Sequence, residues 1–132
     1  MAMTATPVFV QTPKQWFAQV STANTNRDGT GTLVDIVSGA TNGTKIDCIY
    51  IQAAGTVTAG VVRLYVNDGT NTRLWKEVMV TATTPSTSVQ AWNSTIDLSY
   101  PGGGMFIPNG YKLRASTHNS ETFNIIAVGG DF

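Results

Sequence analysis

The sequence has few of the residues that most often carry chemistry or covalent cross-links. Its 132 residues include one cysteine, Cys48, and one histidine, His118. A single cysteine cannot form an internal disulfide, so the fold has to be held together by its core. A zinc site normally needs three or four Cys, His or carboxylate ligands, and this widely separated pair gives no ligand spacing. We therefore expect no metal site and no cofactor.

Charged residues are also scarce, at 12% of the chain, and eight Lys and Arg balance eight Asp and Glu. Without a cationic surplus, neither nucleic acid nor an anionic membrane is an expected partner. No apolar run approaches the roughly 20 residues that span a bilayer. Residues 1–7 have neither the basic nor the apolar region of a signal peptide, so we expect synthesis and folding in a cytosol.

β-branched residues are abundant. The chain contains 41 of them, namely 20 Thr, 13 Val and 8 Ile, against five Leu. These side chains lose rotamer freedom in helices and pack well on pleated sheets. With 42% hydrophobic residues the chain has enough apolar surface to fold, and the composition predicts an all-β protein.

The clearest local signal is a hairpin. Residues 60–67 and 72–80 alternate in polarity, and Asp68-Gly69 between them is typical of a tight turn. In the second strand Leu74, Val78 and Val80 are expected to face the core, with Trp75 on the opposite face.

Further strands are expected about every 8 to 15 residues, at 32–37, 45–52, 89–98, 111–116 and 122–128. This spacing predicts an antiparallel β-sandwich, for which we favour jelly-roll topology. Helix is expected to be limited to one short turn, around 13–18. We expect an extended N-terminal arm over residues 1–15, which pairs with a sheet edge or reaches another subunit, and one sandwich domain over residues 16–132.

Candidate catalytic residues are isolated. We interpret His118 as a solvated residue of a hairpin tip and Cys48 as a small buried hydrophobe. Asp35, Asp47 and Asp97 all lie within predicted strands, so a glycosidase pair of carboxylates remains open. The loops 26–31 and 67–71 place Asp and Asn around a glycine, which we interpret as Asx-turns and not as calcium sites.

The aromatic residues are the candidate interface residues. Phe9, Trp16 and Phe17 are predicted to make the contacts of the arm. For Trp75 we favour packing between subunits, while a place in the core and a role as a sugar-stacking platform stay open.

Several segments resemble small structural proteins encoded in tailed-phage and prophage genomes. They are residues 12–20, 23–31, 58–65, 73–77, 107–113 and 127–132. Such proteins are commonly head decoration (cement) proteins or parts of fibres and tails, often trimeric β-sandwiches. The shared segments are turn and strand motifs, so the resemblance implies no catalytic residues.

The resemblance implies a virion protein made in the bacterial cytoplasm. We expect a non-enzymatic capsid decoration protein that forms a homotrimer and binds the major capsid protein, or another virion protein, on the outside of the head. The alternative is a receptor- or glycan-binding module of a fibre or tail, using residues 100–104 and the His118 tip. A carboxylate glycosidase is the third hypothesis.

Overall fold

The computed structural model describes residues 9–99 and 104–132, and all regular structure in these two ranges is β-strand. The described residues contain no helix that could cross a membrane. The strands are β1 (Thr12–Val20), β2 (Val34–Ser38), β3 (Thr44–Ala53), β4 (Gly60–Asn67), β5 (Thr72–Val80), β6 (Asn93–Asp97), β7 (Met105–Ile107), β8 (Lys112–Thr117) and β9 (Phe123–Asp131).

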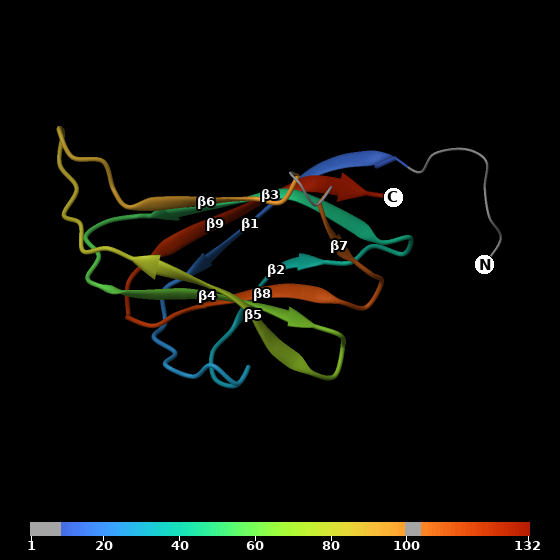
Figure 1. Ribbon diagram of the computed structural model, residues 1–132, viewed down its shortest axis with the longest axis horizontal. Coiled ribbons are helices and arrows are strands. Elements are labelled where there is room, and N and C mark those ends of the chain that lie inside the picture. The colour runs from blue at the N-terminus through green and yellow to red at the C-terminus, as the bar shows by residue number, and fades with distance from the viewer. Residues whose placement is uncertain (1–8, 100–103) are drawn as a thin grey trace.

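The strands form two sheets that pack face to face (Figure 1). The first sheet has the order β1-β9-β3-β6, and the short β7 also pairs with β3. The second sheet has the order β2-β8-β4-β5, and the paired strands of both sheets run antiparallel. The predicted all-β sandwich is therefore confirmed, while jelly-roll topology stays a prediction.

The core lies between the sheets and consists mainly of aliphatic side chains. Alternate residues point inward along the central strands, as the pleat requires. The fully buried members include Ile46, Ile49, Ile51, Val62, Leu64, Ile107, Leu113 and Ile125. Most of them are β-branched, which explains why the composition predicted the fold class.

The predicted hairpin is confirmed, because β4 and β5 have the predicted bounds and pair antiparallel. Gly69 has a φ of 99°, a conformation that costs an L side chain energy. The Asp68 carboxylate accepts hydrogen bonds from the backbone N–H groups of Thr70 and Asn71, at 2.9 and 2.7 Å. This is the expected Asx-turn, and Asp28 makes a similar bond to the N–H of Thr30.

The helical turn predicted around residues 13–18 is wrong. These residues belong to β1, which pairs with β9 in continuous register from Thr12 to Val20. Along β1 the side chains of Trp16 and Ala18 pack against the core, whereas Phe17 is exposed. Burial thus alternates every two residues, as in a strand and not as in a helix. Residues 12–15 of the predicted arm thus pair with a sheet strand, and residues 1–8 lie outside the described residues.

Two β-bulges change the face that side chains occupy. In β3 the register shifts between Ile46 and Cys48, and Cys48 lies opposite the outward-facing Val128. The prediction of a buried cysteine is therefore corrected: Cys48 is half-buried on the outer face. In β5 the extra residue lies opposite Leu64, and Trp75 packs against the core instead of facing away from it.

Candidate functional site

The outer face of the first sheet carries a row of mainly apolar side chains. The pairing aligns Phe17 of β1, Ile126 of β9, Tyr50 of β3 and Thr95 of β6, which we call the central row. Phe17 is 80% exposed and Tyr50 is 43% exposed. Two large aromatic rings exposed in one row across a regular sheet are unusual for a surface that faces only water.

Polar side chains flank the central row on both sides. One flanking row consists of the amides Gln19, Asn124, Gln52 and Asn93. The other consists of Gln15, Val128, Cys48 and Asp97.

The face is therefore nearly free of charge. The three rows contain no lysine or arginine and a single carboxylate, Asp97. A side-chain hydrogen bond with the neighbouring Cys48 raises the pKa of the Tyr50 hydroxyl further above neutral pH. An apolar centre with a mainly polar border that carries little charge is typical of a protein-protein interface.

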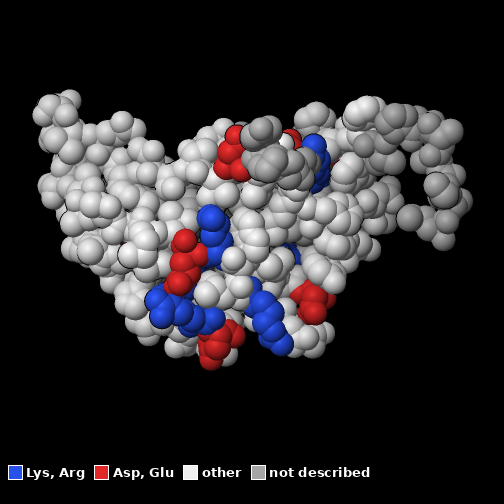
Figure 2. All heavy atoms as spheres, in the orientation of Figure 1, with Lys and Arg blue, Asp and Glu red and all other residues white. Residues whose placement is uncertain are grey.

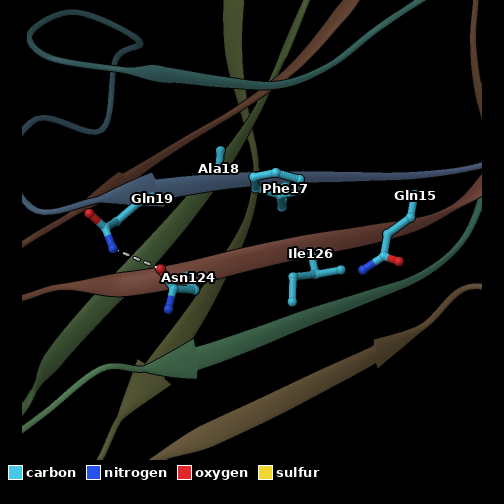
Figure 3. A pocket seen from close by; sticks show the side chains of 6 residues that line it. All are labelled: Gln15, Phe17, Ala18, Gln19, Asn124 and Ile126. Atoms are coloured by element: carbon cyan, nitrogen blue, oxygen red, sulfur yellow. Dashed lines mark hydrogen bonds between the residues drawn. The ribbon is translucent and has the colours of Figure 1, made fainter.

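A groove runs beside Phe17, where the edge strand β1 meets β9 (Figure 3). Its volume is about 500 Å³. The Gln19 amide donates a hydrogen bond of 2.9 Å to the side-chain oxygen of Asn124 at one end of the groove. The lining residues are Gln15, Phe17, Ala18, Gln19, Asn124 and Ile126. The groove thus offers one aromatic ring surrounded by amide donors and acceptors.

A second exposed group of aromatic side chains lies where the chain enters β1. The Phe106 and Phe132 rings are 5.8 Å apart, and they line a shallow hollow with Phe9, Gln11 and Asn42. Phe9 is 69% exposed and Phe106 is 55% exposed. We call Phe9, Phe106 and Phe132 the aromatic cluster.

Charged side chains gather over the second sheet. Most of the blue and red atoms visible in Figure 2 lie in the lower half of the view, where Figure 1 places β4, β5 and β8. On the β2 and β8 side, Asp35 pairs with Arg114 at 2.6 Å and with Lys112 at 3.3 Å. The central row and the aromatic cluster are thus segregated from most of the charge.

A buried arginine links the segment between β1 and β2 to the second sheet by hydrogen bonds. Arg63 in β4 is 1% exposed, and its guanidinium donates to Glu77 at 2.9 Å and to the carbonyl oxygen of Asn24 at 3.1 Å. A third contact, of 3.1 Å, joins Arg63 to Nδ1 of His118. Because arginine only donates, this nitrogen accepts. Hydrogen bonds from Arg27 and then Arg63 hold the pKa of Glu77 below its ordinary value.

This arrangement corrects the interpretation of His118 as a solvated tip residue, since its ring is half-buried against Arg63. The described residues hold no group of three or more His, Cys, Asp or Glu side chains that would suit a metal ion.

The three candidate carboxylates each have a partner of their own. Asp35 lies in the second sheet, whereas Asp47 and Asp97 belong to the first. Asp47 pairs with Lys45 at 3.2 Å. The hydroxyl and N–H of Ser99 hold the pKa of Asp97 below its ordinary value. A glycosidase acid needs a raised pKa, so this carboxyl is unsuited to donate a proton.

The four predicted interface residues do not form one site. Phe17 belongs to the central row and Phe9 to the aromatic cluster. Trp16 and Trp75 pack against the core. Sequence reasoning missed Tyr50, Ile126 and Phe106, although the alternation in β9 would have placed Ile126 on the side opposite to Ile125.

Comparison with known proteins finds no family model that matches the chain and no similar curated protein. The relation to phage structural proteins therefore stays a prediction from the turn and strand segments named above.

Proposed function

We propose that this protein is a non-enzymatic virion structural protein, a capsid decoration protein that trimerises and binds the outer surface of a phage head. The observation that carries the proposal is the aromatic cluster. An exposed cluster at the entrance to β1 is suited to anchor a protein on a neighbouring surface, because buried aromatic rings dominate interface energetics.

The strand order is consistent with this role. We infer that β1-β9-β3-β6 facing β2-β8-β4-β5 is a jelly roll, because successive strands repeatedly pass from one sheet to the other. This architecture is common in capsid proteins. A rigid sandwich with few charges also suits a protein that has to bind at many symmetric positions, where avidity multiplies weak contacts.

The proposal is tested by co-sedimentation with heads assembled from the major capsid protein encoded nearest to this gene. Wild-type protein is expected to sediment with the heads, and Phe9→Ser/Phe106→Ser is expected to stay in the supernatant. Met79→Ser is the matched control, because Met79 is 73% exposed but lies in β5 of the other sheet. Absence of wild-type binding would refute the head-binding role.

The second candidate is a receptor- or glycan-binding module of a phage fibre or tail. The groove beside Phe17 favours it, because an aromatic ring bordered by Gln15, Gln19 and Asn124 can stack on a sugar and bind its hydroxyls. Of the loops predicted for this role, residues 100–103 lie outside the described residues, and His118 is engaged by Arg63. Glycan-array binding that is lost in Phe17→Ala would establish this function instead.

A further inference from the structure

The two sheets end in edge strands that differ in how well they are protected against pairing with another chain. Edge strands are usually shortened, bulged or charged, because their free N–H and C=O groups otherwise attract a further strand. In the second sheet, β2 has five residues and a bulge, and β5 has a bulge and carries Arg73, Lys76 and Glu77. In the first sheet, β6 has five residues and β7 has three.

β1 has much weaker protection. It is nine residues long and pairs with β9 without any register shift. Its one charged side chain, Lys14, is neutralised by Asp131 at 2.5 Å. Beyond Pro13 the strand has no proline, and it carries the 80% exposed Phe17 at its middle. Among the described residues, 9–99 and 104–132, β1 is therefore the edge most open to strand addition.

The side chains of β1 are complementary to those of a second, antiparallel β1. Residues on the same face oppose one another when Phe17 lies across from Phe17 of the other copy. This register sets Gln15 opposite Gln19, so that two amides meet on each side of the phenylalanine pair. On the inner face it sets the large Trp16 opposite the small Ala18, which fills space without overlap.

We propose that β1 pairs with β1 of a second copy of this chain around a two-fold axis. This pairing joins the first sheet of one copy to the first sheet of the other and makes one continuous sheet. The two Phe17 rings would pack against each other at the axis, and the two central rows would run on across it. Aromatic pairs directly opposed on antiparallel strands stabilise such a ladder.

The contact does not depend on the proposed function. A two-fold contact links two protomers, whether they form a free dimer or belong to adjacent trimers. It would therefore persist in a protein that binds no head.

The first test is the mass of the assembly in solution, measured by light scattering and sedimentation equilibrium on the full chain of 14.0 kDa. Phe17→Lys is expected to reduce the mass of the wild-type assembly to half or less, because it places two like charges opposite each other. Met79→Lys, on the edge of the other sheet, is the control and is expected to leave the mass unchanged. Both side chains are mostly exposed, so circular dichroism is expected to be unchanged in both variants.

The second test establishes the register. In a Cys48→Ser background, Gln15→Cys and Gln19→Cys chains are mixed and treated with a short bis-methanethiosulfonate linker. Opposed residues have Cβ atoms about 5 Å apart, whereas the two Gln15 positions lie about 13 Å apart along the strands. Cross-linked dimers are expected in the mixture and not in either variant alone.

A wild-type mass that Phe17→Lys does not change would overturn the proposal, as would cross-linking that is equal in the mixture and in the separate variants. Pairing of β1 with an extended segment of another protein would appear as such an unchanged mass. If wild-type protein does not bind heads but Phe17→Lys lowers the mass of the assembly, the decoration role is refuted and the β1 pairing stands.

Discussion

Arg63 shows how one buried polar side chain determines the shape of a surface. Its guanidinium reaches Glu77 in β5, the Asn24 carbonyl in the segment before β2, and His118 after β8. Tyr65 adds a hydrogen bond of 2.8 Å from its hydroxyl to the carbonyl oxygen of Asn26. As a result β4 is buried on both faces at its centre, although a sandwich strand normally has one wet face.

Replacing Arg63 with Met is expected to lower the free energy of unfolding by about 2 kcal/mol, because the Asn24 carbonyl oxygen loses its donor inside the protein. Glu77→Gln is expected to be more destabilising, since it leaves the buried guanidinium without a carboxylate. Urea unfolding followed by tryptophan fluorescence measures both. Arg73→Met is the control, because Arg73 is exposed and its one side-chain hydrogen bond within the described part of the chain goes to the adjacent Thr72 carbonyl. Equal effects of Arg63→Met and Arg73→Met would contradict the role assigned to Arg63.

Asp131 makes stability depend on pH. The Lys14 ammonium, and then the Thr44 hydroxyl, hold the pKa of this carboxyl below its ordinary value of about 3.9. A carboxyl with a lowered folded-state pKa stabilises the fold fully above its unfolded-state pKa and loses this contribution as the pH falls through the folded-state pKa.

Wild-type protein is accordingly expected to unfold at higher urea than Asp131→Asn at pH 7, and the difference is expected to shrink once the pH falls below about 3.9. Denaturant titrations at a series of pH values give the comparison. A difference that stays constant down to the lowest pH would show that the Asp131 charge does not stabilise the fold.

At the scale of the elements, turns and bulges decide how well strand faces can be predicted. The β4–β5 hairpin followed from local chemistry, because Asp68 and Gly69 form the turn by themselves. The bulges in β3 and β5 have no comparable local signal. Each extra residue reverses the alternation beyond it, which is why Cys48 and Trp75 lie on faces opposite to those predicted.

Gly69→Ala is expected to destabilise the protein by about 1 kcal/mol, because alanine is strained at a positive φ. Gly55→Ala is the matched control: Gly55 has no positive φ, and an added Cβ would meet no atom within 4 Å. Thermal unfolding of both variants tests this, and equal melting temperatures would show that the turn tolerates a side chain.

At the scale of the whole molecule, charge and exposed apolar surface are separated. The ion pairs of Glu77 and Asp35 lie on the second sheet, whereas those on the first sheet, Lys14–Asp131 and Lys45–Asp47, each join one cation to one anion. Amide side chains border the groove beside Phe17 and the hollow at the aromatic cluster. Contacts made through these surfaces depend on apolar burial and hydrogen bonds, which salt screens little.

Binding to heads is therefore expected to change less than about tenfold between about 0.1 and 1 M salt, over which the Debye length falls from about 10 to about 3 Å. Co-sedimentation at increasing salt measures this, with Met79→Lys as a variant that adds a charge away from both surfaces. A steep, continuous loss of wild-type binding would show that the binding surface is a charged one.

The sequence by itself determined the fold class, the hairpin and the two Asx-turns, because each depends on residues close together in the chain. Alternation is a property of a few consecutive side chains, and a glycine turn needs only its own backbone. The tertiary structure decided that β1 is the terminal strand of its sheet, that Phe17 is exposed while Trp16 packs inward, and that Arg63 is buried. These outcomes depend on β9, on the segment before β2 and on the opposite sheet, whose positions are set by contacts between distant parts of the chain.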